Sequence, residues 1–88
     1  MKVYVLYRPK SDHARRTEEF VRDFKGQHSV NVEVIDVDSR DGVATASLYD
    51  VLTYPTVLVM TEDGQLLKTW SGEEVPPLMN ELASYAYS

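Results

Sequence analysis

The segment Pro55–Trp70, "PTVLVMTEDGQLLKTW", constrains the fold of this chain more than any other part of the sequence. Thr56–Met60 is a continuous apolar run, which is typical of a central strand that is covered on both faces. Asp63-Gly64 favours a tight hairpin turn, because these residue types adopt positive φ at low cost. Gln65–Trp70 then pairs back as an antiparallel strand. The segment therefore predicts a β-hairpin whose first strand lies inside a sheet.

Two more strands are expected upstream, with a helix between them. Lys2–Tyr7 is short and rich in β-branched and aromatic residues, and Val30–Val37 alternates with Val30, Val32 and Val34 on one side. Between these strands, apolar residues recur at helical spacing. We expect this helix to begin at Ser11 or Asp12, whose side chains can cap it, and to end at Gly26, which suits a left-handed stop.

The remaining pattern predicts two further helices. Asp41 can cap a helix that runs to about Leu52, and Pro76-Pro77 precede a final helix. The buried stripe of that last helix is expected to contain Val75, Leu78, Met79, Leu82, Ala83 and Ala86. Since helices join the first three strands, we expect right-handed parallel crossovers between them. The order β-α-β-α-β-β-α predicts one α/β domain over residues 1–88: a four-stranded mixed sheet with helices on both faces.

Composition excludes several classes of function. The net charge of -5 argues against nucleic-acid binding, which needs a basic surface. No apolar run reaches the length of a signal peptide or of a membrane span, so we expect no membrane contact and a cytoplasmic location. The two histidines are isolated, and Asp36–Gly42 fits a calcium loop poorly, so no metal or other cofactor is expected. The chain contains no cysteine, which removes disulfides and thiolate chemistry.

Beyond these features, the segment Tyr49–Gly72 resembles the second half of a thioredoxin. The shared pattern is a hydrophobic residue, Pro-Thr, an apolar strand, a turn with glycine, a second strand and a closing glycine. In this chain it comprises Tyr54, Pro55-Thr56, Val57–Met60, Asp63-Gly64, Leu66–Trp70 and Gly72. The element order also resembles thioredoxins and glutaredoxins, without the leading strand and helix of a full thioredoxin. The resemblance implies a glutaredoxin-sized thioredoxin fold with a cis peptide bond at Pro55.

The same resemblance identifies the position of the redox motif. The family carries Cys-x-x-Cys after the first of these strands, and the matching residues here are Ser11, Asp12, His13 and Ala14. Thiol–disulfide exchange needs a thiolate to attack a disulfide and a second thiol to resolve the mixed disulfide. A serine hydroxyl and an alanine methyl cannot do either. Dithiol–disulfide oxidoreductase activity is therefore excluded, and no catalytic residue is assigned.

The candidate site is a ligand groove around this degenerate motif. We expect it to contain Arg8, Ser11, His13, Tyr54, Pro55 and Thr56. Arg8, Lys10, Arg15 and Arg16 would add a basic rim suited to an acidic peptide or another anion. By resemblance, Arg8 matches a lysine that binds the glutathione carboxylate in glutaredoxins. Trp70 is expected either in the core or at the surface.

These residues support two main hypotheses about function. The first is a redox-inactive module that binds an extended peptide of an unknown protein partner through backbone hydrogen bonds beside Pro55. The alternative is a glutathione-binding or glutathione-transferase-like enzyme that acts through Ser11, although the same serine can simply cap the helix. A third reading is a subunit whose groove is vestigial and whose function lies on another surface.

Overall fold

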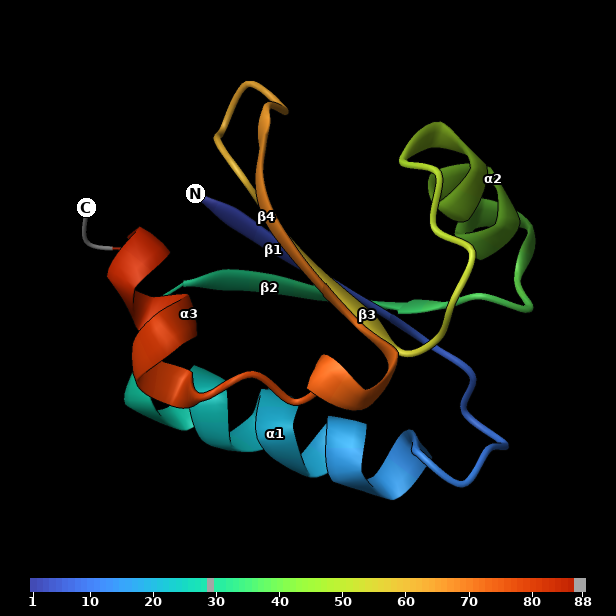
Figure 1. The fold of residues 1–88 in the computed structure, drawn as a ribbon, viewed down its shortest axis with the longest axis horizontal. Helices are drawn as coiled ribbons and strands as arrows, with labels where there is room; N and C mark the ends of the chain where they lie inside the picture. Colours follow the sequence, from blue (N-terminus) through green and yellow to red (C-terminus); the bar gives the residue numbers. More distant parts are fainter. Residues whose placement is uncertain (29, 87–88) are drawn as a thin grey trace.

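We describe a computed structural model of the chain over residues 1–28 and 30–86. The elements follow the expected order (Figure 1). The strands are β1 (Lys2–Tyr7), β2 (Asn31–Asp36), β3 (Thr56–Met60) and β4 (Leu66–Ser71). The helices are α1 (Ala14–Gln27), α2 (Arg40–Leu48) and α3 (Met79–Ala86), and a short 3₁₀ turn, η1 (Gly72–Glu74), follows β4.

The four strands form one mixed sheet in the order β2-β1-β3-β4. β1 runs parallel to β2 and antiparallel to β3, and β3 runs antiparallel to β4. The expected parallel crossover into β3 is therefore wrong. α2 has 9 residues and spans about 13 Å, against about 20 Å for a strand of six residues, so this helix does not run back along the whole sheet. α2 stays at the end of the sheet where β2 finishes, so β3 starts from that end (Figure 1).

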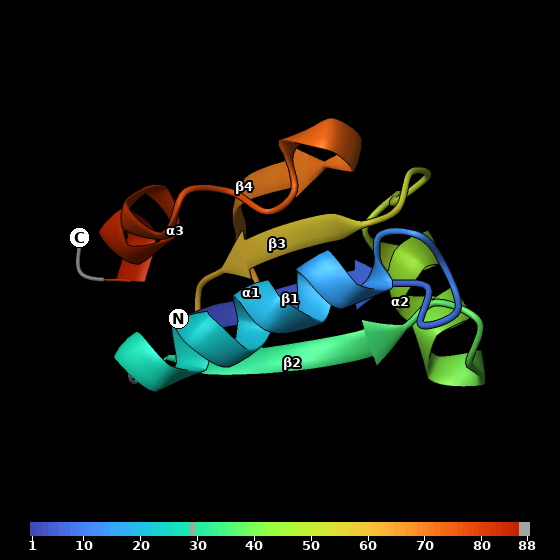
Figure 2. The same cartoon turned by 90° about the horizontal axis from the view of Figure 1, so that it is seen from below.

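Helices cover both faces of the sheet, as expected (Figure 2). On one face, Phe20 and Phe24 of α1 and Leu82 of α3 pack on Val5 and Val57. On the other face, the core consists of Leu6, Val37, Ala46, Val51 and Leu58, with Ala46 supplied by α2. The alternation of side chains along β1 and β3 explains this division, since neighbouring residues of a strand point to opposite faces.

The C-terminal part of the chain completes the core under α1. Trp70 is a core residue with 4% of its surface exposed, and its ring lies edge-on to Tyr85 at 5.8 Å. Leu82 is buried, but Leu78 is 65% exposed and so does not belong to the expected stripe. The side chains of Met79 and Ala86, also expected in that stripe, lie outside what the structure describes. Within residues 1–28 and 30–86, no helix is both long and apolar enough to cross a lipid bilayer.

Four expected helix ends are wrong. Ser39 caps α2 in place of Asp41, because its Oγ accepts a hydrogen bond from the N–H of Gly42 at 2.9 Å, and the helix ends at Leu48. Gly26 lies inside α1 without a positive φ, and the helix passes into extended backbone at His28. Neither Ser11 nor Asp12 caps α1, whose N-cap is His13.

Gly42 sets how closely α2 approaches the end of β2. A Cβ atom at this position would lie 1.9 Å from the carbonyl oxygen of Asp36. No side-chain rearrangement can relieve that clash, because the obstacle is backbone. Only glycine therefore allows the first turn of α2 to pack against the strand.

The substitution Gly42→Ala should destabilise the chain by about 1–3 kcal/mol or more, since either the helix or the strand end must move. Gly26→Ala is a matched control, because a Cβ atom there meets nothing within 4 Å. That control should stabilise α1 by about 0.5–1 kcal/mol. Urea unfolding of the two variants measures both changes, and equal free energies of unfolding would contradict the proposed role of Gly42.

Candidate functional site

Three segments that are distant in the sequence meet at the end of the sheet where β1 finishes. They are the loop between β1 and α1, the Tyr54-Pro55 segment before β3, and the turn η1 after β4. The Tyr54–Pro55 peptide bond is cis, and the carbonyl of Pro55 accepts a hydrogen bond of 2.9 Å from the N–H of Gly72. Gly72 has φ +60, a conformation that favours glycine, so the turn can close against Pro55.

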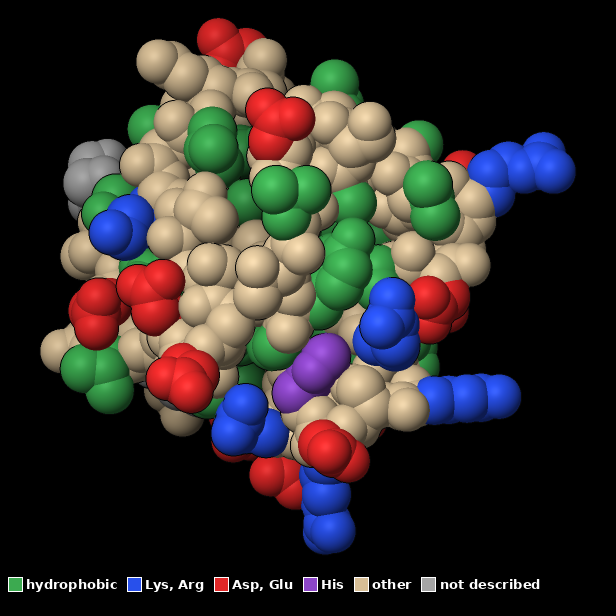
Figure 3. Space-filling model, turned by 45° about the vertical axis from the view of Figure 1, so that its right-hand side comes forward, with side chains coloured by type: hydrophobic (Ala, Val, Ile, Leu, Met, Phe, Trp, Pro, Cys, Tyr) green, Lys and Arg blue, Asp and Glu red, His purple; other side chains and the backbone are tan. Residues whose placement is uncertain are grey.

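The three segments enclose a surface hollow of about 320 Å³, which we call the Pro55 groove. Its walls are Asp12, His13, Arg16, Tyr54, Pro55, Gly72 and Glu73. Arg16 on α1 and Glu73 on η1 place opposite charges on the groove. Figure 3 shows this side of the molecule, with a histidine at the surface beside basic side chains.

The structure brings together only part of the expected site. His13, Tyr54 and Pro55 line the groove, together with Asp12 of the degenerate motif. Thr56 does not: it is 1% exposed, and its hydroxyl donates to the carbonyl of Thr53 at 2.5 Å. The fourth motif residue, Ala14, is buried at the start of α1 with 7% exposure. The expectation for Thr56 is wrong because its side chain is buried on a face of the sheet and bonded to the preceding loop.

Ser11 occupies a turn before the helix rather than its N-cap. Its hydroxyl donates to the carbonyl of Arg8 at 2.6 Å, and its own carbonyl accepts from the N–H of Ala14 at 3.2 Å. The N-cap position belongs to His13, which makes no side-chain capping bond. Ser11 therefore closes the loop between β1 and α1, and it does not line the Pro55 groove.

Sequence reasoning missed Gly72 and Glu73 as groove residues, and it placed Arg16 only in the basic rim. Arg16 lies three positions after His13, so the two share a face of the helix. Glu73 carried no such signal, because its position depends on how η1 folds back against Pro55.

Arg8 lies beside the groove and holds its wall in place. Its guanidinium Nε lies 3.2 Å from both carboxylate oxygens of Asp38. Its Cζ stands 5.7 Å from the centroid of the Tyr54 ring, within the range of a cation–π contact. Arg8 thus links the β1–α1 loop, the end of β2 and Tyr54.

The expected basic rim is only partly available to a ligand. Arg8 is paired with Asp38, and Nε of Arg15 lies 3.3 Å from Glu19. Arg16 and Lys10 form no ion pair within the described residues. Of these two, Arg16 lines the groove, so it is the cation best placed to meet an anionic group there.

The surroundings of His13 and Tyr7 shift the pKa values of both side chains. The imidazole Nε2 accepts a hydrogen bond from the N–H of Arg8 at 3.1 Å. Burial lowers the pKa of His13, and the positive charges of Arg16 and Arg8 lower it further. Tyr7 donates to the carboxylate of Glu18 at 2.6 Å, and this bond is the main cause that raises the pKa of Tyr7 to about 12. Both groups therefore stay in their neutral forms at neutral pH.

The backbone of Tyr54 is the most open part of the groove wall. Tyr54 is partly exposed. It lies two positions before Thr56, the first residue of β3, and Thr56 pairs with Leu6 and Ser71. In the part of the chain that the structure describes, neither its N–H nor its carbonyl has a hydrogen-bond partner. Backbone polar groups at such positions are normally satisfied by protein, water or a ligand.

No cofactor chemistry is apparent from the side chains of this site. Within residues 1–28 and 30–86, no group of three His, Asp or Glu side chains could hold a metal ion. The chain has no cysteine, so the groove cannot exchange disulfides. What the arrangement offers is hydrogen-bonding groups, the Tyr54 ring, one positive charge at Arg16 and two negative charges at Asp12 and Glu73.

Solved structures of several thioredoxins are similar to this chain over most of its length, and this similarity identifies the fold. Thioredoxin 1 of Thermosipho africanus matches with a TM-score of 0.79 at 18% identity, over 99% of this chain and 96% of that one. The germline-specific thioredoxin Deadhead of Drosophila melanogaster matches with 0.78 at 22%, over 94% and 78%. A mutant thioredoxin of Halobacterium salinarum matches with 0.79 at 26%, over 96% and 73%.

The fold is thioredoxin-like. No protein-family model and no curated protein matches the sequence, so the likeness is one of structure. The expected resemblance is confirmed at this level: residues Ser11 to His13 lie between β1 and α1, Ala14 begins α1, and none of these residues is a cysteine.

The lowered pKa of His13 makes a prediction about stability. Since the unfolded imidazole has a pKa near 6.5, the unfolded state binds protons before the folded state does. The free energy of unfolding should therefore fall as the pH drops from about 6.5 through the lower folded pKa. His13→Gln should lose this part of the pH dependence. Urea unfolding at several pH values measures it, and an NMR titration that finds the folded His13 pKa at or above 6.5 would contradict it.

Proposed function

We propose that this chain is a redox-inactive thioredoxin-fold protein that binds an extended peptide segment of a partner protein in the Pro55 groove. The observation that carries the proposal is the unpartnered N–H and carbonyl of Tyr54 beside a hollow of about 320 Å³. An extended peptide can satisfy both groups by adding a short stretch of strand pairing, which needs no catalytic residue. No enzymatic role is proposed, and a cytoplasmic location stays a prediction.

The side chains around Tyr54 define the kind of peptide that fits. The Tyr54 ring, supported by Arg8, offers an apolar contact. Arg16 offers an unpaired positive charge on the α1 side, and Glu73 a negative charge on the η1 side. A peptide with an apolar residue and an acidic residue on the α1 side would complement the Tyr54 ring and Arg16.

A titration followed by two-dimensional NMR tests the proposal. Short extended peptides with one apolar residue are added in matched pairs that differ only in Asp or Asn. The amide signal of Tyr54 should shift on binding and exchange more slowly with solvent, because its N–H gains a partner. Shifts confined to β4 or to α3, or none with any peptide, would contradict the proposal.

Two substitutions separate the contributions of the groove walls. Tyr54→Ala should weaken binding of every peptide by about tenfold, since it removes the central aromatic contact. Arg16→Glu should weaken the Asp peptides and leave the Asn peptides nearly unchanged. Lys68→Glu, which reverses a charge on β4 outside the groove, is the control and should have no effect. Equal losses for Asp and Asn peptides with Arg16→Glu would show that the charge of Arg16 plays no part.

The alternative function, glutathione binding through Ser11, finds no supporting contact. The Ser11 hydroxyl already donates to the carbonyl of Arg8 at 2.6 Å. We therefore expect the chain to pass unretained over immobilised glutathione. Retention that disappears in Ser11→Ala would favour the enzyme instead.

A further inference from the structure

The two edges of the sheet differ in how well they are protected from pairing with another strand. β4 carries Lys68 and pairs with β3 through an irregular register at Val59 and Met60. Lysines and bulges are common devices that prevent edge-to-edge association. β2 has neither: it contains no lysine or proline, and all six of its residues pair with β1 in continuous register. Figure 2 shows β2 as the outermost strand on its side.

The outer edge of β2 presents free backbone groups at two valines. Just beyond the strand, the N–H of Val37 donates to the carbonyl of Tyr7 on β1 at 3.1 Å. In a parallel pair, alternate residues direct both of their backbone groups to the same neighbour. Residues 33 and 35 therefore face β1, while Val32 and Val34 direct their N–H and carbonyl groups away from the sheet. Within the described residues, β2 has no strand neighbour other than β1.

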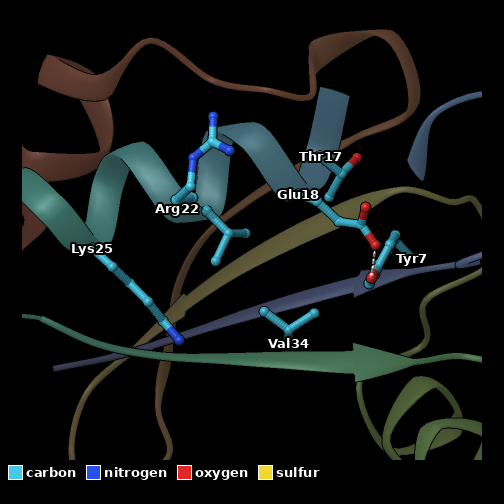
Figure 4. Close-up of a pocket in the computed structure, with 7 residues that line it drawn as sticks. Tyr7, Thr17, Glu18, Arg22, Lys25 and Val34 are labelled. Atoms are coloured by element: carbon cyan, nitrogen blue, oxygen red, sulfur yellow. Dashed lines mark hydrogen bonds between the residues drawn. The ribbon is translucent and has the colours of Figure 1, made fainter. Parts of the chain in front are cut away.

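An apolar hollow of about 390 Å³ lies beside this edge, between α1 and β2. Val21 of α1 and Val34 of β2 form part of its lining, and Val34 is 40% exposed. Figure 4 shows Val34 pointing from β2 toward α1, with Lys25 reaching from α1 toward β2. The edge thus combines unpaired backbone with apolar surface at its centre.

The charges along this edge are arranged with opposite signs at its two ends. Glu18 and Lys25 both line the hollow and lie seven positions apart, which places them on one face of α1 about two turns from each other. Asp36 ends β2 on the same side as Glu18, since α1 runs antiparallel to β2. Lys25 forms no ion pair within the described residues, and Glu18 is held by Tyr7. Arg22, which also lines the hollow, is paired with Asp23 at 3.7 Å, and Glu33 lies on the opposite face of β2 from Val34.

We propose that a second copy of this chain pairs with the β2 edge, antiparallel and about a two-fold axis near Val34. An edge that is positive at one end and negative at the other is complementary to itself in that orientation. The pairing brings Lys25 of each copy beside Glu18 of the other, joins the free backbone groups of Val32 and Val34, and covers the exposed valine at the centre. A two-fold interface needs this kind of self-complementarity. The product is a continuous sheet of both copies.

This dimer goes beyond the proposed function and does not depend on it. None of the residues that line the Pro55 groove belongs to β2, so both grooves stay accessible in the pair. Failure of peptide binding would leave the dimer untouched, and failure of dimerisation would leave the groove untouched.

Sedimentation equilibrium of the full chain over a range of concentrations tests the dimer. We expect a reversible monomer–dimer equilibrium. Hydrogen exchange should show slower exchange at Val32 and Val34 amides as the concentration rises. Val34→Pro should abolish the dimer, because it removes an outward N–H that β1 does not use. Lys25→Glu should weaken dimerisation about tenfold or more, since it places two negative charges together.

The controls keep the proposal falsifiable even if one variant folds poorly. The double variant Lys25→Glu, Glu18→Lys has the wild-type net charge and exchanges the two signs, so it should dimerise again. Lys68→Glu makes the same charge reversal on β4 and should leave the equilibrium unchanged. The proposal is overturned by a monomer at every concentration, by a dimer that persists in folded Val34→Pro, or by equal weakening with Lys68→Glu.

Discussion

The antiparallel pairing of β1 with β3 is the interaction on which the rest of this structure depends. β1 is bonded on both edges, and Val3, Val5 and Leu6 are completely buried. The register pairs Leu6 with Thr56, so the end of β1 lies beside the start of β3. This alone brings the Tyr54-Pro55 segment next to the loop that carries His13. Had β3 run parallel to β1, the two halves of the groove would lie at opposite ends of the sheet.

The periodicity of the sequence predicted the elements but not the direction of β3. Alternating or continuous apolar residues identify a strand and say whether one face or both are covered, and the run Thr56–Met60 is buried throughout as expected. Direction depends on whether the connecting segment returns along the sheet. That property lies in the length of α2 and in the packing of Gly42 against Asp36, where a Cβ atom would come within 1.9 Å of the strand carbonyl.

The sequence predicted the site residues whose position follows from the start of a strand. It did not predict the contacts of side chains that have more than one hydrogen-bond partner within reach. Pro55 and Tyr54 are fixed by the strand start, and both line the groove. Ser11 had a helix N-terminus and a loop carbonyl within reach, and it donates to the carbonyl of Arg8. Glu73 reaches the groove because η1 turns back at Gly72. No pattern in the neighbouring sequence predicts this turn.

Apart from the Ser11 bond that closes the β1–α1 loop, the contacts that shape the groove do not involve the side chains of Ser11 and Ala14, the positions that match the cysteines of thioredoxins. Its walls are held by the bond from Gly72 to Pro55, by the pairing of Arg8 with Asp38 and Tyr54, and by the bond from Arg8 to His13. Of these, only the last uses a residue of the degenerate motif. The hollow therefore needs no thiol, because the backbone and the flanking loops support it. The recognition that we propose relies on the backbone groups of Tyr54, so it needs no cysteine either.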